Sequence, residues 1–205
     1  MCAVAELVAD TLREGHRVVA FGTGHSHLIA EDLFMRAGGL RAVEAVLEPS
    51  LMLHEGAAKS SALEKLPGYA AILVGQAGVE AGDVVLVVSS SGRNAVPVEF
   101  AEESHRRGCT VVAITSVTHS GAVASCAPSG RRLMEVADLV LDNAVPAGDA
   151  AVDLPGRPER VGALSTLTGS ALAQAVVAEA ATRLCEQGVD PGVLVSYNVD
   201  PGTPT

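Results

Sequence analysis

The chain has 205 residues, is 48% hydrophobic but only 2% aromatic, and carries a formal net charge of −10 at pH 7. This length suits a single domain over residues 1–205, with a core built mainly from Ala, Val, Leu and Gly. The acidic balance leaves no basic stripe that could displace counterions from DNA or RNA, so we expect no nucleic-acid partner.

The sequence predicts neither a membrane segment nor a secretory leader. No apolar run reaches the ~18 residues that a membrane span needs, and the N-terminal segment is acidic rather than basic, with Glu6 and Asp10. The four cysteines lack C-x-x-C spacing, which argues against a zinc site or a disulfide framework and suggests a reducing compartment. We therefore expect a cytoplasmic protein with no membrane partner.

Helical and strand patterns alternate along the first half of the chain. In order, we predict a helix over 3–14, a strand over 17–21, a helix from the turn 22–27 through 37, a strand over 41–47, an irregular stretch over 49–59, and a mostly helical stretch over 60–76 broken at Pro67. The first helix begins almost at Met1, which leaves open whether Met1 is the natural start.

The second half continues the alternation. In order, we predict a strand over 83–88, a helix over 95–107, strands over 110–115 and 138–141, a loop over 146–158 that is rich in Gly, Pro and Asp, and a long helix that begins near Ser165 and runs to 187. A tail from about residue 190 shows no clear period.

This alternation predicts an α/β fold, a three-layer α/β/α sandwich around a five-stranded parallel sheet. Five strands favour the flavodoxin-like order 2-1-3-4-5, in which ligands bind at the switch point between the first and third strands. The loops that follow those two strands, residues 22–27 (GTGHSH) and 89–94 (SSSGRN), are then expected to face each other across one crevice.

The loop after the third strand has the composition of an anion cradle. A β-branched run over 84–88 leads directly into Ser89, Ser90, Ser91 and Gly92, and a helix follows. Free backbone N–H groups at the helix start attract phosphate, and the hydroxyls add further donors. The alternative is an ordinary serine N-cap, but three consecutive hydroxyls exceed what a cap needs.

The loop after the first strand partly matches the dinucleotide fingerprint G-x-G-x-x-G. Gly22 and Gly24 match its first two glycines, but His27 occupies the third position, where a bulky residue hinders close helix–strand packing. NAD is therefore the weaker interpretation of this loop, and we predict no cofactor.

Together the two loops resemble the sugar isomerase (SIS) domain family. GTGHSH with the following LIAEDLFMRAGGL, and VVSSSGRNAVPVEFAEE, are similar to a bacterial group of SIS-domain proteins related to phosphoheptose isomerase. The resemblance runs from about residue 5 to LVSYNVD near the end. It implies a phosphorylated sugar as ligand, no metal in most members, and obligate oligomers, here a homodimer or homotetramer.

The resemblance also implies which residues hold the sugar phosphate. Ser26, Ser89, Ser91 and Asn94 match positions that surround the phosphate in the family. From the same two loops, the predicted binding residues also include Gly24, His25, Ser90 and Gly92. At the start of the last helix, Ser165 and Thr166 are simple N-capping residues or, as the resemblance suggests, part of the sugar site.

One departure from the family concerns the catalytic base. Phosphoheptose isomerases and etherases carry a glutamate further along the helix after the first loop, and a gapless comparison from Ser26 places Arg36 there. Glu55, flanked by apolar or small residues, is the first candidate base, with a solvated loop acid as the alternative. Glu31 is the second candidate, with an exposed or ion-paired helix residue as the alternative.

Three histidines are candidates for the same crevice. His25 can donate to a phosphate or hydroxyl, and His119 follows the fourth strand at the ligand-binding edge, where it could open the sugar ring as an acid. His54, beside Glu55, is an alternative partner. No H-x-x-x-H or H-E-x-x-H spacing occurs, so we predict no metal site.

The predicted function is that of a phosphosugar isomerase or lyase. It would remove the C2 proton of an aldose or N-acetylhexosamine 6-phosphate, which lies next to the carbonyl of the open-chain sugar. Return of the proton at C1 gives an isomerase, whereas loss of the C3 substituent gives a lyase. The alternative is a non-catalytic phosphosugar-binding sensor.

Overall fold

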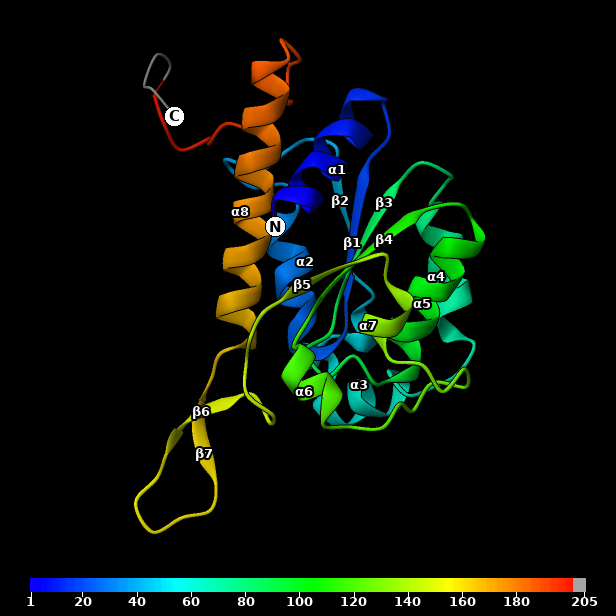
Figure 1. Cartoon of the computed structure of the whole chain (residues 1–205), viewed down its shortest axis with the longest axis vertical. Helices are drawn as coiled ribbons and strands as arrows, with labels where there is room; N and C mark the ends of the chain where they lie inside the picture. The colour runs from blue at the N-terminus through cyan, green and yellow to red at the C-terminus, as the bar shows by residue number, and fades with distance from the viewer. Residues whose placement is uncertain (201–205) are drawn as a thin grey trace.

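Five short, valine-rich strands form a parallel sheet in the computed structural model, which describes residues 1–200 (Figure 1). The strands are β1 (Val18–Gly22), β2 (Val43–Val46), β3 (Val84–Val88), β4 (Thr110–Thr115) and β5 (Leu139–Asp142). Their order is β2-β1-β3-β4-β5, which confirms the predicted order. Val18 of β1 pairs with Val43 on one side and with Val84 on the other.

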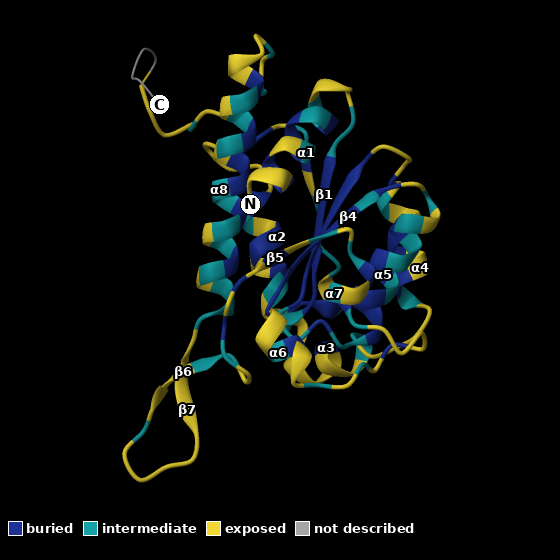
Figure 2. Ribbon diagram, viewed as in Figure 1, coloured by how far each residue is buried: buried dark blue, intermediate teal, exposed yellow. Residues whose placement is uncertain are grey.

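Helices cover both faces of the sheet, as Figures 1 and 2 show. The helices on one face are α1 (Cys2–Arg13), α2 (His27–Leu33) and α8 (Ser165–Glu186), and those on the other are α4 (Tyr69–Ala77), α5 (Ala95–Arg106) and α7 (Leu133–Val136). The short helices α3 (Ala57–Leu63) and α6 (Val117–Gly121) lie at the edge where the strands end. The predicted three-layer sandwich is confirmed.

Successive strand residues divide between two apolar cores. Val18 and Ala20 of β1 pack beneath α1, α2 and α8, whereas Val19 and Phe21 point to the opposite core. There Phe21 stacks on Phe100 of α5, with ring centroids 4.0 Å apart. Since every β1 and β3 residue is buried, these strands are unbroken apolar runs, as expected for central parallel strands.

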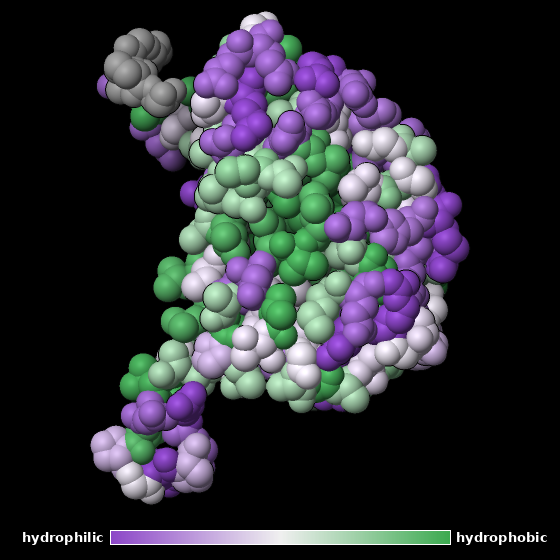
Figure 3. Space-filling view, viewed as in Figure 1, coloured by the Kyte–Doolittle hydropathy of each residue, from purple (hydrophilic) through white to green (hydrophobic). Residues whose placement is uncertain are grey.

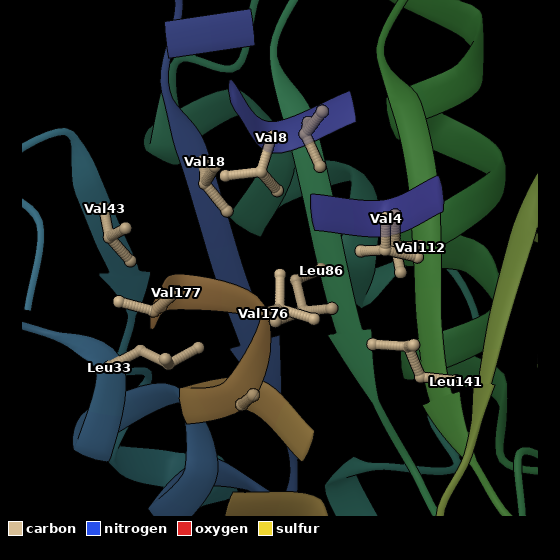
Figure 4. Close-up of a pocket in the computed structure, with 12 residues that line it drawn as sticks. Val4, Val8, Val18, Leu33, Val43, Leu86, Val112, Leu141, Val176 and Val177 are labelled. Carbon is tan, nitrogen blue, oxygen red and sulfur yellow. The ribbon is translucent and has the colours of Figure 1, made fainter. Parts of the chain in front are cut away.

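A narrow gap remains in the core beneath α1, α2 and α8 (Figure 4). Only aliphatic side chains line it: Val4, Val8, Val18, Leu33, Val43, Val84, Leu86, Val112, Leu141, Ala173, Val176 and Val177. No polar side chain among them could orient a ligand or take part in proton transfer, so we interpret the gap as loosely filled core. Within residues 1–200, no helix is both long and apolar enough to span a bilayer.

The helix after the first loop is shorter than predicted. It ends at Leu33 rather than near residue 37, because Phe34 is extended and Met35 is left-handed. The following backbone is paired elsewhere: Gly38 N–H donates to the carbonyl of Leu194 at 2.8 Å, and Leu194 N–H donates to the carbonyl of Gly39 at 2.9 Å. The predicted tail therefore docks on this segment; residues 201–205 lie outside the described residues.

The prediction of a loop over 146–158 is wrong, because this stretch contains a strand. β6 (Ala150–Asp153) pairs antiparallel with β7 (Arg160–Ala163). This hairpin projects away from the sandwich and is exposed along most of its length (Figure 2). Glycines, prolines and aspartates around the two short strands hid the pattern, since such composition normally indicates turns.

Candidate functional site

The loops after β1 and β3 face each other across one crevice, as predicted from the strand order. The crevice spans about 730 Å³, part of it open to solvent. Its lining residues are Thr23, Gly24, His25, Ser26, Leu53, Ser60, Ser61, Glu64, Ser89, Ser90, Ser91, Asn94, His119, Asp149 and Ser165. It lies at the switch point of the sheet, because β1 is followed by β2 on one side and β3 is followed by β4 on the other.

Two glycines shape the first loop. Gly22 ends β1 so close to the following turn that a Cβ atom there would lie 2.5 Å from the carbonyl oxygen of Ser26. Gly24 has a left-handed φ of +55°, which a side chain would strain. From Gly24 to Ser26 the chain makes a short 3-10 turn, closed by Ser26 N–H donating to the carbonyl of Thr23 at 3.0 Å. This turn brings Ser26 and His25 to the crevice.

The loop after β3, residues 89–94, is called the serine loop below. It is held by hydrogen bonds in which its hydroxyl oxygens accept. Gly92 N–H donates to Ser89 Oγ at 3.2 Å, and Asn143 Nδ2 donates to Ser90 Oγ at 3.1 Å. A hydroxyl that accepts from the protein keeps its own hydrogen for another acceptor. Asn94 occupies the N-cap position of α5 but makes no side-chain capping bond in the described chain. The loop therefore presents donors to the crevice.

Glu64 links the two loops, and the sequence prediction missed it. Its carboxylate accepts a hydrogen bond from Thr23 Oγ1 in the first loop at 2.9 Å. Its backbone carbonyl accepts from Val96 N–H, at the start of α5 after the serine loop, at 3.0 Å. The polar spacing of Ser60, Ser61 and Glu64 along one predicted helix was the available signal for a functional face.

His119 enters the crevice from α6. The backbone N–H of His119 donates to Ser116 Oγ at 2.9 Å, which caps this short helix. Its side-chain Nδ1 is buried and has no hydrogen-bond partner in the described part of the chain. His119 therefore lines the crevice with one ring nitrogen that the described protein groups leave without a partner.

Asp149 and Ser165 line a further part of the crevice. Asp149 lies at the base of the hairpin with a left-handed φ of +68°. Its Oδ1 accepts from the backbone N–H groups of Leu164 at 3.1 Å and Ser165 at 2.8 Å, and its Oδ2 accepts from Ser165 Oγ at 2.6 Å. Asp149 thus fixes the start of α8 and the direction of the Ser165 hydroxyl. The sequence prediction missed it because it lies in the supposed loop.

Three predicted residues lie outside the lining of the crevice. Glu55 is exposed and pairs with Lys59, with Oε2 3.2 Å from Nζ. Glu31 is exposed on α2, 3.8 Å from the Nε2 atom of the buried His27. His54 is exposed, and its ring lies in an edge-type arrangement with the ring of His27, with centroids 6.2 Å apart. Neither the base role of Glu55 nor that of Glu31 gains support from its position.

Two further predicted binding residues also stand back from the crevice. Gly92 is a buried residue of the serine loop, and a Cβ atom there would lie 3.2 Å from side-chain atoms of Leu133, Ser120 and Thr115. Thr166 is half-buried on α8 and does not line the crevice, although its neighbour Ser165 does. The structure therefore brings together residues 23–26 of the first loop with residues 89–91 and Asn94 of the second, rather than every residue of each predicted loop.

The charged lining of the crevice is acidic. Glu64 and Asp149 are its carboxylates, and neither lysine nor arginine occurs among the described lining residues. An anion in this crevice would be held by N–H and O–H dipoles rather than by a cation. Within residues 1–200, no group of three or more His, Cys, Asp and Glu side chains is arranged to hold a metal ion.

Comparison with known proteins places these features in a family. The model of the SIS domain matches residues 1–116. A UPF0309 protein of Halalkalibacterium halodurans is 45% identical over 196 residues, which cover 96% of this chain and 81% of that protein.

Solved structures share the fold at low sequence identity. A phosphoheptose isomerase from Francisella tularensis gives a TM-score of 0.53 at 19% identity, covering 87% of this chain and 84% of that chain. The Vibrio vulnificus NanR protein complexed with ManNAc-6P gives a TM-score of 0.52 at 18% identity, covering 91% of this chain and 56% of that chain.

Proposed function

The chain belongs to the SIS domain family, and from that premise we propose that it binds a phosphorylated sugar and removes the proton at C2, as an isomerase or a lyase. The observation that carries the proposal is the crevice itself. Hydroxyl donors from two loops lie there together with one glutamate, Glu64, and the imidazole of His119.

The phosphate is proposed to lie between Ser26 and the serine loop. Ser89 and Ser90 have hydrogens to donate, and phosphate oxygens are strong acceptors. The nearby start of α5 adds the positive end of a helix dipole. Two solved structures with the same fold are a phosphoheptose isomerase and a NanR protein complexed with ManNAc-6P, which favours a sugar phosphate over other anions.

Glu64 is the proposed base in place of Glu55 and Glu31, because it is the glutamate that lines the crevice. In this scheme the Glu64 carboxylate takes the C2 proton of the open-chain aldose, and the C–H electrons form a C1–C2 double bond. The carbonyl oxygen at C1 takes a proton from His119. Return of a proton to C1, with loss of the C2 hydroxyl proton as C2 becomes the carbonyl carbon, gives the ketose. In the lyase branch the C1 hydroxyl gives its proton back, the C1 carbonyl re-forms, the double bond moves to C2–C3, and the C3 substituent leaves with its bonding electron pair and takes up a proton.

We also propose that the chain works in the cytoplasm as a homodimer or homotetramer. Apolar side chains gather over α1 and β5 on the face shown in Figure 3, and Leu167 on α8 is 69% exposed. Such contiguous apolar surface favours association. Light scattering during size-exclusion chromatography checks the assembly: a mass of two or four chains is expected, and a monomer at micromolar concentration contradicts it.

The decisive experiment is hydrogen exchange at C2. N-acetylglucosamine 6-phosphate, glucose 6-phosphate and related sugar phosphates are incubated with the protein in deuterated water, and deuterium at C2 is followed by NMR. Incorporation with at least one of them is expected for an enzyme. Binding without exchange across the panel would assign the crevice to a sensor, and failure to bind any sugar phosphate would contradict both functions.

A further inference from the structure

We propose that the crevice offers hydrogen-bond donors to one end of its ligand and hydrogen-bond acceptors to the other. It therefore selects a sugar monophosphate that carries no second negative charge. The serine loop can donate hydrogen bonds to an anion, whereas the side chains of Asp149 and Ser165 can only accept hydrogen bonds from a ligand, because the Ser165 hydroxyl already donates to Asp149. This inference rests on the proposed function, because it concerns the selectivity of the same crevice. It does not depend on whether the bound sugar then reacts.

The donor end of the crevice is the serine loop, where protein N–H groups donate to the serine oxygens and leave the hydroxyl hydrogens for a ligand. Asn143 is 4% exposed and uses its Nδ2 atom to donate to Ser90 Oγ at 3.1 Å. Gly92 N–H does the same for Ser89 Oγ at 3.2 Å. Because each serine oxygen already accepts from the protein, its single hydrogen is available to an acceptor in the crevice. Phosphate oxygens are acceptors and match this end.

The acceptor end of the crevice consists of Asp149 and Ser165, and Asp149 fixes the direction of the Ser165 hydroxyl. Ser165 Oγ donates its only hydrogen to Asp149 Oδ2 at 2.6 Å, so its remaining lone pairs can only accept. Asp149 also accepts from the backbone N–H groups of Leu164 and Ser165, so these two donors at the start of α8 are not available to an anion. A neutral sugar hydroxyl, which has a hydrogen to donate, matches this end, and a carboxylate or second phosphate does not.

Charge reinforces the same preference. Asp149 and Glu64 are the carboxylates of the described lining, and neither a lysine nor an arginine lies among the lining residues. A second anion on the ligand would face these like charges with no lysine or arginine to offset them. We therefore expect an added carboxylate at the far end of the ligand to weaken binding by at least ~10-fold.

Two open-chain probes differ only in this feature. Sorbitol 6-phosphate carries a hydroxymethyl group at C1, where 6-phosphogluconate carries a carboxylate, and both carry the same phosphate. Titration calorimetry with the wild-type chain is expected to give at least ~10-fold tighter binding of sorbitol 6-phosphate. Equal affinity for the two probes would overturn the inference, and this comparison needs no variant to fold.

The variant Asp149→Asn tests the assignment to Asp149. Asparagine accepts the left-handed backbone, keeps an oxygen for the two N–H groups, and turns an amide donor toward Ser165 Oγ. The Ser165 hydrogen is then free, and one negative charge is gone. The preference for sorbitol 6-phosphate is expected to fall about 10-fold. A change in stability alone would not alter this ratio, so Asp149 is tested as a positioning residue.

Matched controls separate this inference from the proposed function. Thr166→Ala, one residue beyond Ser165 and outside the lining, is expected to leave the ratio of affinities unchanged. Inorganic phosphate is expected to bind wild type and Asp149→Asn within about 3-fold, because it needs only the serine loop. An unchanged ratio in Asp149→Asn would overturn the inference while leaving the function. Failure of the wild type to bind sorbitol 6-phosphate and inorganic phosphate would instead overturn both.

Discussion

Replacing Glu64 by Gln is expected to lower the rate of deuterium exchange at C2 by about 10²–10⁴-fold, the usual contribution of a general base. Glutamine has nearly the same shape and retains an oxygen that can accept from Thr23 Oγ1, now 2.9 Å from Glu64 Oε2. The crevice should therefore keep its form while losing the group that accepts the proton. Initial rates at saturating sugar phosphate measure the effect, and calorimetry checks that affinity changes by no more than about 3-fold.

Glu55→Gln is the matched control for this substitution. Its carboxylate is exposed and paired with Lys59 at 3.2 Å, outside the lining of the crevice. An exposed pair of this kind contributes little to stability, so both the melting temperature and the exchange rate should stay at their wild-type values. If exchange is lost in Glu55→Gln and kept in Glu64→Gln, the base is Glu55 and the proposal for Glu64 is wrong.

Replacing Gly22 by Ala is expected to destabilise the chain and to abolish phosphate binding. The new Cβ atom would lie 2.5 Å from the carbonyl oxygen and 2.6 Å from the carbonyl carbon of Ser26, both backbone atoms that cannot rotate away. Such overpacking costs about 1–3 kcal/mol or more. For a domain of this size the melting temperature should fall by roughly 2–12 °C. Differential scanning calorimetry measures the fall in melting temperature. Titration with inorganic phosphate measures the loss of binding that a displaced turn would cause.

Gly121→Ala is the control for the added methyl group. Gly121 is the last residue of α6, and its φ is not positive. Beyond its chain neighbours and the backbone of its own helix, no heavy atom lies within 4 Å of the place that the new methyl group would take. Stability and phosphate binding should remain as in the wild type. Wild-type melting and phosphate binding in Gly22→Ala would show that the close approach of Gly22 to Ser26 does not shape the first loop.

The sheet and the two facing loops were predictable because their signals are local in the sequence. The run Val84–Val88 is buried on both faces, so it contains no polar interruption, and Ser89 follows directly after it. The strand order then needs only a count of five strands and the preference for right-handed crossovers. Once that order is given, the loops after β1 and β3 must meet at one edge.

The acidic residues of the crevice were not predictable in this way. Glu64 reaches the first loop through Thr23, 41 residues away in the sequence, and Asp149 reaches Ser165 across a hairpin that resembled a loop. Glu55 was favoured from its apolar sequence neighbours, but a 3-10 turn at Leu53–Glu55 leaves its side chain exposed beside Lys59. Which carboxylate enters a crevice depends on such tertiary contacts, and sequence neighbours do not report them.

The most direct test is a crystal structure of the chain grown with sorbitol 6-phosphate at a concentration that saturates it in solution. We predict phosphate density between Ser26 and the serine loop, within hydrogen-bond distance of Ser89 Oγ and Ser90 Oγ, and the sugar chain beside Glu64. Phosphate density outside the crevice, or reversed density with the phosphate against Asp149, would contradict this account.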